Sequence, residues 1–425
     1  MIIKCLASLL VVLAVSAPPL ARGQSAEDVV RSITSSSEFK AASSALDRDY
    51  DRFVSDLIAL TEIPAPPFKE STRASAFAVK LREAGLAQVE TDAEGNVMGV
   101  LRGSGSGPML AVLAHLDTVF PEGTSTKVGR EGSRINAPGA GDDTAGLATI
   151  LVVVRALKAA GVQTAGDILF VGNVGEEADG NLRGVKYVLQ RGRYKDQVKN
   201  FISLDGGVPG GVVNGGLGSR KYRVTFTGPG GHSYNAFGLV SPGFAMANAL
   251  ARLSRAIVPT RPKTTYNLGT VGGGTSVNSI PTEMWMEVDL RSESPIELQK
   301  IDALFRKMIE ESIAEENATR STSQGKVSAD VKVVGDRPSG QTPETDFLVR
   351  AAIEATRAFG LMPRLDIQST DANIPMSLGI PAVTIGHWQG GRAHSLDEWV
   401  DVEKASVTRS SNITLVTILA VAGRR

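Results

Sequence analysis

The octapeptide NVGEEADG, residues 173–180, places two adjacent glutamates, Glu176 and Glu177, directly after the apolar run 168–174. A short apolar run of this kind is typical of a buried strand in an α/β sheet. Two neighbouring carboxylates at the end of a buried strand repel each other and are costly to remove from water. The stretch therefore predicts a sheet strand and a positive charge beside it, which other strands of the same sheet should help to bind.

Short apolar runs alternate with helical segments on both sides of this octapeptide. We expect strands at residues 97–101, 109–113 and 201–204, and helices at residues 145–160 and 185–191. Short apolar strands that alternate with helices indicate an α/β fold. The fold class predicted for this part of the chain is a mostly parallel central sheet flanked by helices.

The pattern changes near residue 218 and returns to α/β character near residue 336. Between these points the chain has the order β-α-β-β-α-β, which is typical of a small ferredoxin-like α+β unit. The expected strands are 221–226, 266–271, 284–290 and 327–334, and the expected helices are 242–256 and 295–318. We therefore predict one domain, residues 24–218 and 336–425, interrupted by an inserted domain, residues 219–335.

The composition sets limits on the class of protein. A chain of 425 residues is long enough for two domains, and 42% apolar and 21% charged residues are typical of a globular protein. Lys plus Arg and Asp plus Glu both number 45. Because there is no basic surplus, nucleic acid is not an expected partner.

The N-terminus has the features of a signal peptide, assigned to residues 1–23. Lys4 supplies a positive charge, residues 6–17 are apolar, and Ala21-Arg22-Gly23 offers a cleavage site. Roughly 20 apolar residues are needed to span a bilayer, so no stable membrane insertion is expected after cleavage, and an uncleaved anchor is the alternative. Cys5 is the only cysteine, so the mature chain would bind metals through His, Asp and Glu alone. We expect an exported protein, periplasmic or secreted.

Ionisable residues follow four of the predicted strands at their carboxyl ends, where ligands of open α/β sheets bind. Taken singly, each has a simpler explanation: an aspartate that caps a helix, a solvated pair of glutamates, or a structural histidine. Their convergence at one edge of one sheet favours a functional site. The residues are His115, Asp117, Glu176, Glu177, Asp205 and His394, with Asp142 just before a helix.

These residue types in this arrangement predict a metal centre. His115 and Asp117 are two residues apart and would point to one side of an extended chain, where the carboxylate can accept the second ring N–H of the histidine. Histidine, aspartate and glutamate suit zinc, and also manganese or cobalt. One open tetrahedral zinc site cannot use five ligands, whereas two ions about 3.5–4 Å apart that share a carboxylate can. The five are His115, Asp142, Glu177, Asp205 and His394.

Seven motifs in order resemble the co-catalytic zinc exopeptidase family that includes peptidase T, carboxypeptidase G, aminoacylase and acetylornithine deacetylase. The resemblance covers roughly residues 45–425 and implies a catalytic metal-binding domain, residues 24–218 and 336–425, with residues 219–335 as a lid that commonly dimerises. The motifs are HLDTV (115–119), GAGDD (139–143), GEE (175–177), SLDGG (203–207), GGHS (230–233), SVNSIP (276–281) and HSLDEW (394–399).

The resemblance also implies the metal ligands. Two divalent ions per chain are expected, zinc first, with cobalt or manganese as alternatives. Asp142 would bridge the two ions and would be joined to Asp143 by a cis peptide bond. His115 and Asp205 would complete one metal site, and Glu177 and His394 the other.

The resemblance assigns the remaining roles. Glu176 would be the general base that moves a proton from water to the leaving amine, and Asp117 would support the neighbouring histidine ligand. His232 would reach the active site of a partner subunit and stabilise the oxyanion, although a simple turn residue is the alternative. Asn278 and Arg291 would hold the substrate, and for Arg291 a surface ion pair is the alternative.

The expected activity is that of an aminopeptidase- or dipeptidase-like exopeptidase on small peptides, because Asp at the position of Asp205 accompanies such members of the family. The alternatives are an N-acyl amino acid deacylase or carboxypeptidase of the same family, and an inactive metal-containing binding protein. A nucleotide site is not expected at the glycine clusters 103–107 and 206–218, since neither opens a helix after a strand.

Overall fold

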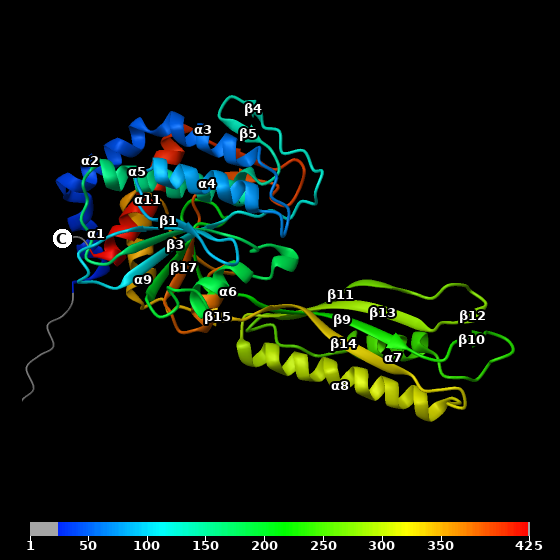
Figure 1. Ribbon diagram of the computed structural model, residues 1–425. Helices are drawn as coiled ribbons and strands as arrows, with labels where there is room; N and C mark the ends of the chain where they lie inside the picture. The colour runs from blue at the N-terminus through cyan, green and yellow to red at the C-terminus, as the bar shows by residue number, and fades with distance from the viewer. Residues whose placement is uncertain (1–23, 424–425) are drawn as a thin grey trace, which may run out of the picture.

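A computed structural model describes residues 24–423 (Figure 1). The predicted signal peptide lies outside the described residues and stays a prediction. The centre of the molecule is a nine-stranded sheet in the order β1-β2-β6-β3-β7-β17-β8-β15, with β16 also paired to β8. Its strands are β1 (Val89–Thr91), β2 (Val97–Leu101), β3 (Met109–His115), β6 (Ile168–Asn173), β7 (Val198–Ser203), β8 (Gly211–Gly216), β15 (Gly340–Gln341), β16 (Arg364–Gln368) and β17 (Ala382–Ile385).

The predicted parallel arrangement holds at the centre of this sheet. β6, β3, β7 and β17 run parallel, as do β16 and β8. The pairs β1–β2, β2–β6, β17–β8 and β15–β8 are antiparallel. The sheet is therefore mixed rather than mostly parallel, and β1 and β2 show one reason: a connection of a few residues can join only antiparallel neighbours.

Helices cover both faces of the sheet and bury it. The larger apolar core lies under α1 (Ala26–Ser35), α2 (Ser37–Arg48), α3 (Tyr50–Thr61), α4 (Ser71–Glu83), α5 (Ala145–Ala159), α9 (Phe347–Ala358) and α11 (Lys404–Ala422). A second core lies under α6 (Arg183–Gln190) and α10 (Asn373–Ser377) on the other face. Among the described residues α11 alone is long and apolar enough to cross a membrane, but 72% of its apolar window is buried, as in a core helix.

Helix α5 approaches the sheet closely at its first turn. A Cβ atom on Gly146 would lie 2.4 Å from the carbonyl oxygen of Leu204, so only glycine fits there. This contact brings the start of α5 against the chain that follows β7. The segment Ala140–Thr144, which precedes α5, is thereby placed at the carboxyl edge of the central strands.

A smaller antiparallel sheet in the order β11-β13-β9-β14 extends from the larger one (Figure 1). It has its own apolar core under two helices. Its elements are β9 (Gly218–Thr227), α7 (Pro242–Leu253), β11 (Thr264–Gly273), β13 (Glu283–Ser292), α8 (Pro295–Thr319) and β14 (Ser328–Arg337). The predicted β-α-β-β-α-β order is present, while its use as a lid or dimerisation domain stays a prediction.

Two further pairs of segments matter for the sites described below. β10 (Gly231–His232) and β12 (Ser279–Ile280) form a short antiparallel pair at the end of the smaller sheet that lies away from the larger one (Figure 1). β4 (Gly129–Glu131), β5 (Arg134–Asn136), β19 (Trp399–Asp401) and β18 (Gln389–Gly391) form a four-stranded sheet. This last sheet joins the chain before Asp142 to the chain around His394.

Candidate metal centre

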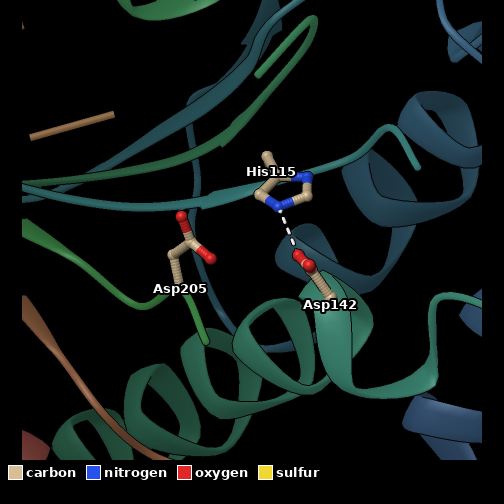
Figure 2. A group of neighbouring side chains, drawn as sticks. All are labelled: His115, Asp142 and Asp205. Carbon is tan, nitrogen blue, oxygen red and sulfur yellow. Dashed lines mark hydrogen bonds and ion pairs between the residues drawn. The ribbon is translucent and has the colours of Figure 1, made fainter. Parts of the chain in front are cut away.

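His115 is the last residue of β3, and its imidazole is held from both sides. The side chain is only 1% exposed. Nδ1 lies 3.0 Å from the backbone carbonyl oxygen of Asp117, and since a carbonyl can only accept, Nδ1 is the donor. Nε2 lies 2.9 Å from Asp142 Oδ1, and Figure 2 shows the carboxylates of Asp142 and Asp205 on the same side of the ring. The ring is thus fixed with Nε2 directed at two carboxylates.

Asp117 does not hold His115 in the expected way. Its Oδ1 is 3.7 Å from His115 Nδ1, beyond a hydrogen bond. The carboxylate instead accepts the backbone N–H groups of Glu176, at 3.0 Å, and Glu177, at 2.8 Å. Because these two bonds occupy the carboxylate, the carbonyl oxygen of Asp117 becomes the acceptor for the histidine. Asp117 therefore orients both the histidine and the adjacent glutamates.

Asp142 has the geometry of a bridging ligand. Its Oδ1 faces His115 Nε2 at 2.9 Å, and its Oδ2 faces His394 Nε2 at 3.0 Å. The peptide bond from Asp142 to Asp143 is cis, as the resemblance implied. Burial opposes ionisation of Asp142, but the hydrogen bonds from the two histidines lower the pKa of its carboxyl below the usual value. The two oxygens of one carboxylate thus serve two different histidines.

The structure brings all five predicted ligands together. His115, Asp142 and Asp205 have ligand atoms within 4.8 Å of one another, and so do Asp142, Glu177 and His394. These two groups share Asp142 and match the predicted division between two ions. A third group of the same size contains His115, Glu176 and Glu177, so the predicted base lies at the same place.

The donor set fits divalent cations. Asp142, Glu176, Glu177 and Asp205 line one cavity of about 490 Å³ together with His394. Hydrogen bonds to Asp142 and Glu177 raise the pKa of His394 to about 10, so the ring carries a proton between two carboxylates. Burial, and next the charge of Asp142, raise the pKa of Asp205 well above its usual value. A cluster of buried carboxylates and imidazoles that retains protons is one that a divalent cation can bind in their place.

Glu398 was not predicted as a site residue, although it lies in the motif HSLDEW. It is buried, and its carboxylate accepts the backbone N–H groups of Gly139 at 3.0 Å, Gly141 at 2.8 Å and Asp142 at 2.9 Å. Burial raises the pKa of Glu398 to about 6. The residue fixes the loop that presents Asp142, and an acidic residue within a recognised motif was the available signal.

Arg337, the last residue of β14, was also missed. Its Nη1 donates to Glu176 Oε1 at 2.8 Å and to Ser369 Oγ at 3.1 Å, and its Nη2 donates to the carbonyl oxygen of Glu176. Burial raises the pKa of Glu176 even though the charge of Arg337 lowers it. An arginine at the end of a half-exposed strand carries no signal of this contact in the sequence.

The predicted substrate residues are not all at the metal centre. Arg291 lines the same cavity and also donates from Nε to Asp289 Oδ2 at 2.8 Å. His232 lies in β10, where its Nδ1 accepts the N–H of Tyr234 at 3.2 Å. Asn278 lies beside β12 and accepts a hydrogen bond from Ser276 at 2.5 Å. Both side chains are exposed and lie at the far end of the smaller sheet (Figure 1).

Comparisons with known proteins agree with this arrangement. The sequence is 26% identical over 355 residues to the uncharacterized protein YqjE of Bacillus subtilis (strain 168), covering 80% of this chain and 89% of that protein. It is 27% identical over 198 residues to carboxypeptidase G2 of Pseudomonas sp. (strain RS-16), covering 46% and 47%.

Solved structures share the fold. Aminopeptidase PepT of Bacillus cereus ATCC 10987 matches with a TM-score of 0.72 at 23% identity, over 88% of this chain and 99% of that one. The YXEP protein of Bacillus subtilis, described as a dinuclear metal-binding peptidase, matches with a TM-score of 0.63 at 19% identity, over 87% and 98%. The sequence profile named Peptidase family M20/M25/M40 matches residues 111–415. The suggested resemblance is confirmed: the chain belongs to peptidase family M20/M25/M40 and is a metallopeptidase, a hydrolase of peptide bonds.

Proposed function

We propose that this protein is an exported two-metal exopeptidase that hydrolyses small peptides in the manner of an aminopeptidase or dipeptidase. The observation that carries the proposal is the position of Asp142, whose two oxygens face His115 and His394 at 2.9 and 3.0 Å. The description of the related YXEP protein as dinuclear supports two ions, and that of PepT as an aminopeptidase supports the activity. Export rests on the N-terminal sequence.

Five residues would hold the ions, with zinc as the proposed metal and cobalt or manganese as alternatives. Bound ions lower the pKa of water toward ~7 and polarise the carbonyl group of a peptide. The chain contributes the fixed positions of the ligands, because Asp117 and Glu398 hold the backbone on both sides of the centre. The ligands are His115 and Asp205 for one ion, Glu177 and His394 for the other, and Asp142 for both.

Glu176 would transfer the proton. Its side chain lines the cavity, and Oε1 accepts a hydrogen bond from Arg337, which leaves Oε2 for the reacting groups. Burial raises the pKa of Glu176 above its usual value, which is the direction that favours a carboxylate as a general base. Oε2 would take a proton from the attacking water and deliver it to the nitrogen of the leaving amine as the C–N bond breaks.

The smaller sheet would act as a lid and dimerisation surface. Among the described residues, the side chains of His232 and Asn278 bond only to chain neighbours, so they would serve the reaction only if the sheet moves or a second copy supplies them. A homodimer in which His232 reaches the partner's active site would meet this requirement. The partners proposed are thus a small peptide and a second copy of the chain.

A carboxypeptidase or N-acyl amino acid deacylase activity is the second candidate. Arg291 and Arg337 both line the cavity, and two guanidinium groups suit a substrate that carries a free carboxylate. The similarity to carboxypeptidase G2 points the same way. An inactive metal-containing binding protein is the third candidate.

Metal analysis and substrate assays on the purified mature protein test these proposals together. The assay uses free dipeptides and tripeptides, C-terminally blocked peptides and N-acyl amino acids, with Glu176→Gln as the matched control. Two ions per chain with cleavage that requires a free amine support the aminopeptidase or dipeptidase. A requirement for a free carboxylate, or turnover of N-acyl amino acids, supports the second candidate. Two ions without turnover of any substrate support the inactive protein, and a chain that binds no metal contradicts all three.

A further inference from the structure

A second cavity, of about 860 Å³, is lined by residues of the loops that precede Asp142 and surround His394, and it carries an excess of positive charge. Three cationic side chains line it, from Lys127, Arg134 and Arg392, against one carboxylate, from Asp397. Asp397 pairs with Arg392 at 3.1 Å. This cavity, called the basic cavity below, therefore keeps two cationic groups without an acidic partner among the described residues.

Arg134 is held in one orientation within the basic cavity. Its guanidinium lies over the ring of Trp399 at 4.3 Å from the centroid, and its Nε donates to Asn136 Oδ1 at 2.7 Å. These contacts leave both Nη groups available, and no carboxylate of the described chain pairs with them. A guanidinium fixed through its stem and Nε presents a planar pair of donors, which is the arrangement that binds a carboxylate through both oxygens.

The basic cavity is connected to the metal centre by three loops. Arg392 lines the basic cavity and His394, two residues later, lines the catalytic cavity. Two Cα–Cα steps place the two residues within about 7.6 Å of each other along the backbone. Pro138 in the basic cavity lies four residues before Asp142, and Gly123 lies four residues after Val119, which lines the catalytic cavity. The two cavities are thus lined by neighbouring residues of the same loops, which is the arrangement expected of adjacent parts of one substrate site.

We propose that the basic cavity is a specificity site for the carboxylate of an acidic side chain, so that the preferred substrates are small peptides containing Glu or Asp. The inference rests on the proposed peptidase function and adds its substrate class. A carboxylate would bind the Nη groups of Arg134, with the charges of Lys127 and Arg392 beside it. Such charge-assisted bonds contribute about tenfold or more to binding.

Peptide binding tests the inference without requiring turnover. Three alanine tripeptides carrying Glu at position 1, 2 or 3 are each compared with the Gln counterpart, by calorimetry on metal-loaded Glu176→Gln protein. In at least one pair the Glu peptide should bind roughly tenfold more tightly than the Gln peptide. Higher salt should reduce that ratio, because salt screens the charges of the basic cavity. If no pair differs, the inference is wrong, whether or not the wild-type protein hydrolyses the neutral peptides. Hydrolysis of the Gln peptides by wild-type protein reports separately on the proposed function.

Variants locate the effect. Arg134→Gln in the same background should remove the Glu preference and leave binding of the Gln peptide unchanged, whereas Arg130→Gln, an exposed arginine on β4 outside the cavity, should change neither. Asp397→Asn removes the competing carboxylate and should increase the Glu preference about two- to threefold. An equal loss for Glu and Gln peptides in Arg134→Gln would show that the residue only supports the fold. Inorganic phosphate is a second probe: binding of phosphate that depends on Arg134, with no difference between Glu and Gln peptides, would also overturn the inference.

Discussion

The larger and the smaller sheet present their candidate residues in opposite ways. At the edge of the larger sheet His115 and Asp142 are directed at each other, and the loops that carry them are held by bonds to Asp117, Asp143 and Glu398. At the far end of the smaller sheet the side chains of His232 and Asn278 are exposed, and among the described residues their hydrogen bonds reach only neighbours along the chain. One chain therefore brings all five candidate metal ligands together, whereas a role for His232 and Asn278 would depend on movement or on a second copy.

The largest effect is expected when the shared ligand is removed. Asp142→Ala deletes the carboxylate that faces both histidines, so both ions should be lost. The loss of turnover should exceed the roughly 10²–10⁴-fold that a general base contributes. Metal analysis after dialysis measures the first effect and peptide hydrolysis the second. Asp330→Ala, an exposed carboxylate on β14, is the control. If Asp142→Ala retained two ions, Asp142 would not be the ligand that both ions share.

Removal of the base should separate chemistry from metal binding. Glu176→Gln keeps the shape of the side chain and its contact with Arg337 but cannot accept the proton from water. Turnover should fall by about 10²–10⁴-fold while the metal content stays at that of the wild type. Steady-state kinetics on a metal-loaded sample measure the effect. A wild-type rate would mean that another group accepts the proton.

The clustering of His115, Glu177 and Asp205 could be predicted from the sequence because its signal is local, whereas the grouping of the five ligands around two ions also drew on the family resemblance. An apolar run predicts a strand, and a histidine or carboxylate directly after it falls at the functional edge of the sheet. Arg337 and Glu398 could not be found in this way, since they contact groups 161 and up to 259 residues away. The contact of Asp117 was wrong for a different reason: backbone N–H groups and a backbone carbonyl compete with side chains, and residue types do not reveal which partner is bound. The antiparallel margins of the sheet likewise depend on pairings that no single strand specifies.

A His232 variant tests whether the far end of the smaller sheet acts on the metal centre. If His232 stabilises the oxyanion, His232→Ala should lower kcat by about 10²–10³-fold, with metal content unchanged. Asn235→Ala, an exposed neighbour, serves as the control. Unchanged kinetics in His232→Ala would show that His232 takes no part in the reaction.

Mixing two inactive variants tests whether His232 acts within its own chain or on a partner subunit. If His232 acts across subunits, mixing His232→Ala chains with Glu176→Gln chains should restore activity, because a mixed dimer contains one site with both intact residues. The assay is turnover after the two proteins have been incubated together, compared with each protein alone. No recovery in dimers shown to have exchanged subunits would place the action of His232 within its own chain.

Arg337 links the two regions, because it ends β14 of the smaller sheet and binds Glu176 at the larger one. Arg337→Gln should lower kcat by about 10- to 100-fold, the size of a charge-assisted hydrogen bond. The charge of Arg337 lowers the pKa of Glu176, so its removal should raise that pKa. Since the base must be deprotonated, the acid limb of the rate profile should move to higher pH, and Arg337→Lys should restore part of the shift. A lower rate with an unmoved profile would mean that Arg337 affects only substrate binding or folding.

The last prediction concerns stability rather than rate, and it rests on a buried histidine of the larger region. His387 is 5% exposed, and its Nε2 lies 3.8 Å from Asp143 Oδ1. Burial lowers the pKa of His387 to about 4, against a usual value of about 6.5. Between these values the unfolded chain binds more protons than the folded chain, so the free energy of unfolding should fall as pH drops from 6.5 to 4, by up to about 3 kcal/mol from this residue. Denaturant unfolding of metal-free wild type and His387→Asn across this range should give curves that converge at low pH. Parallel curves would show that the imidazole of His387 ionises equally in both states, and that its burial beside the metal centre has no part in the acid sensitivity of the larger region.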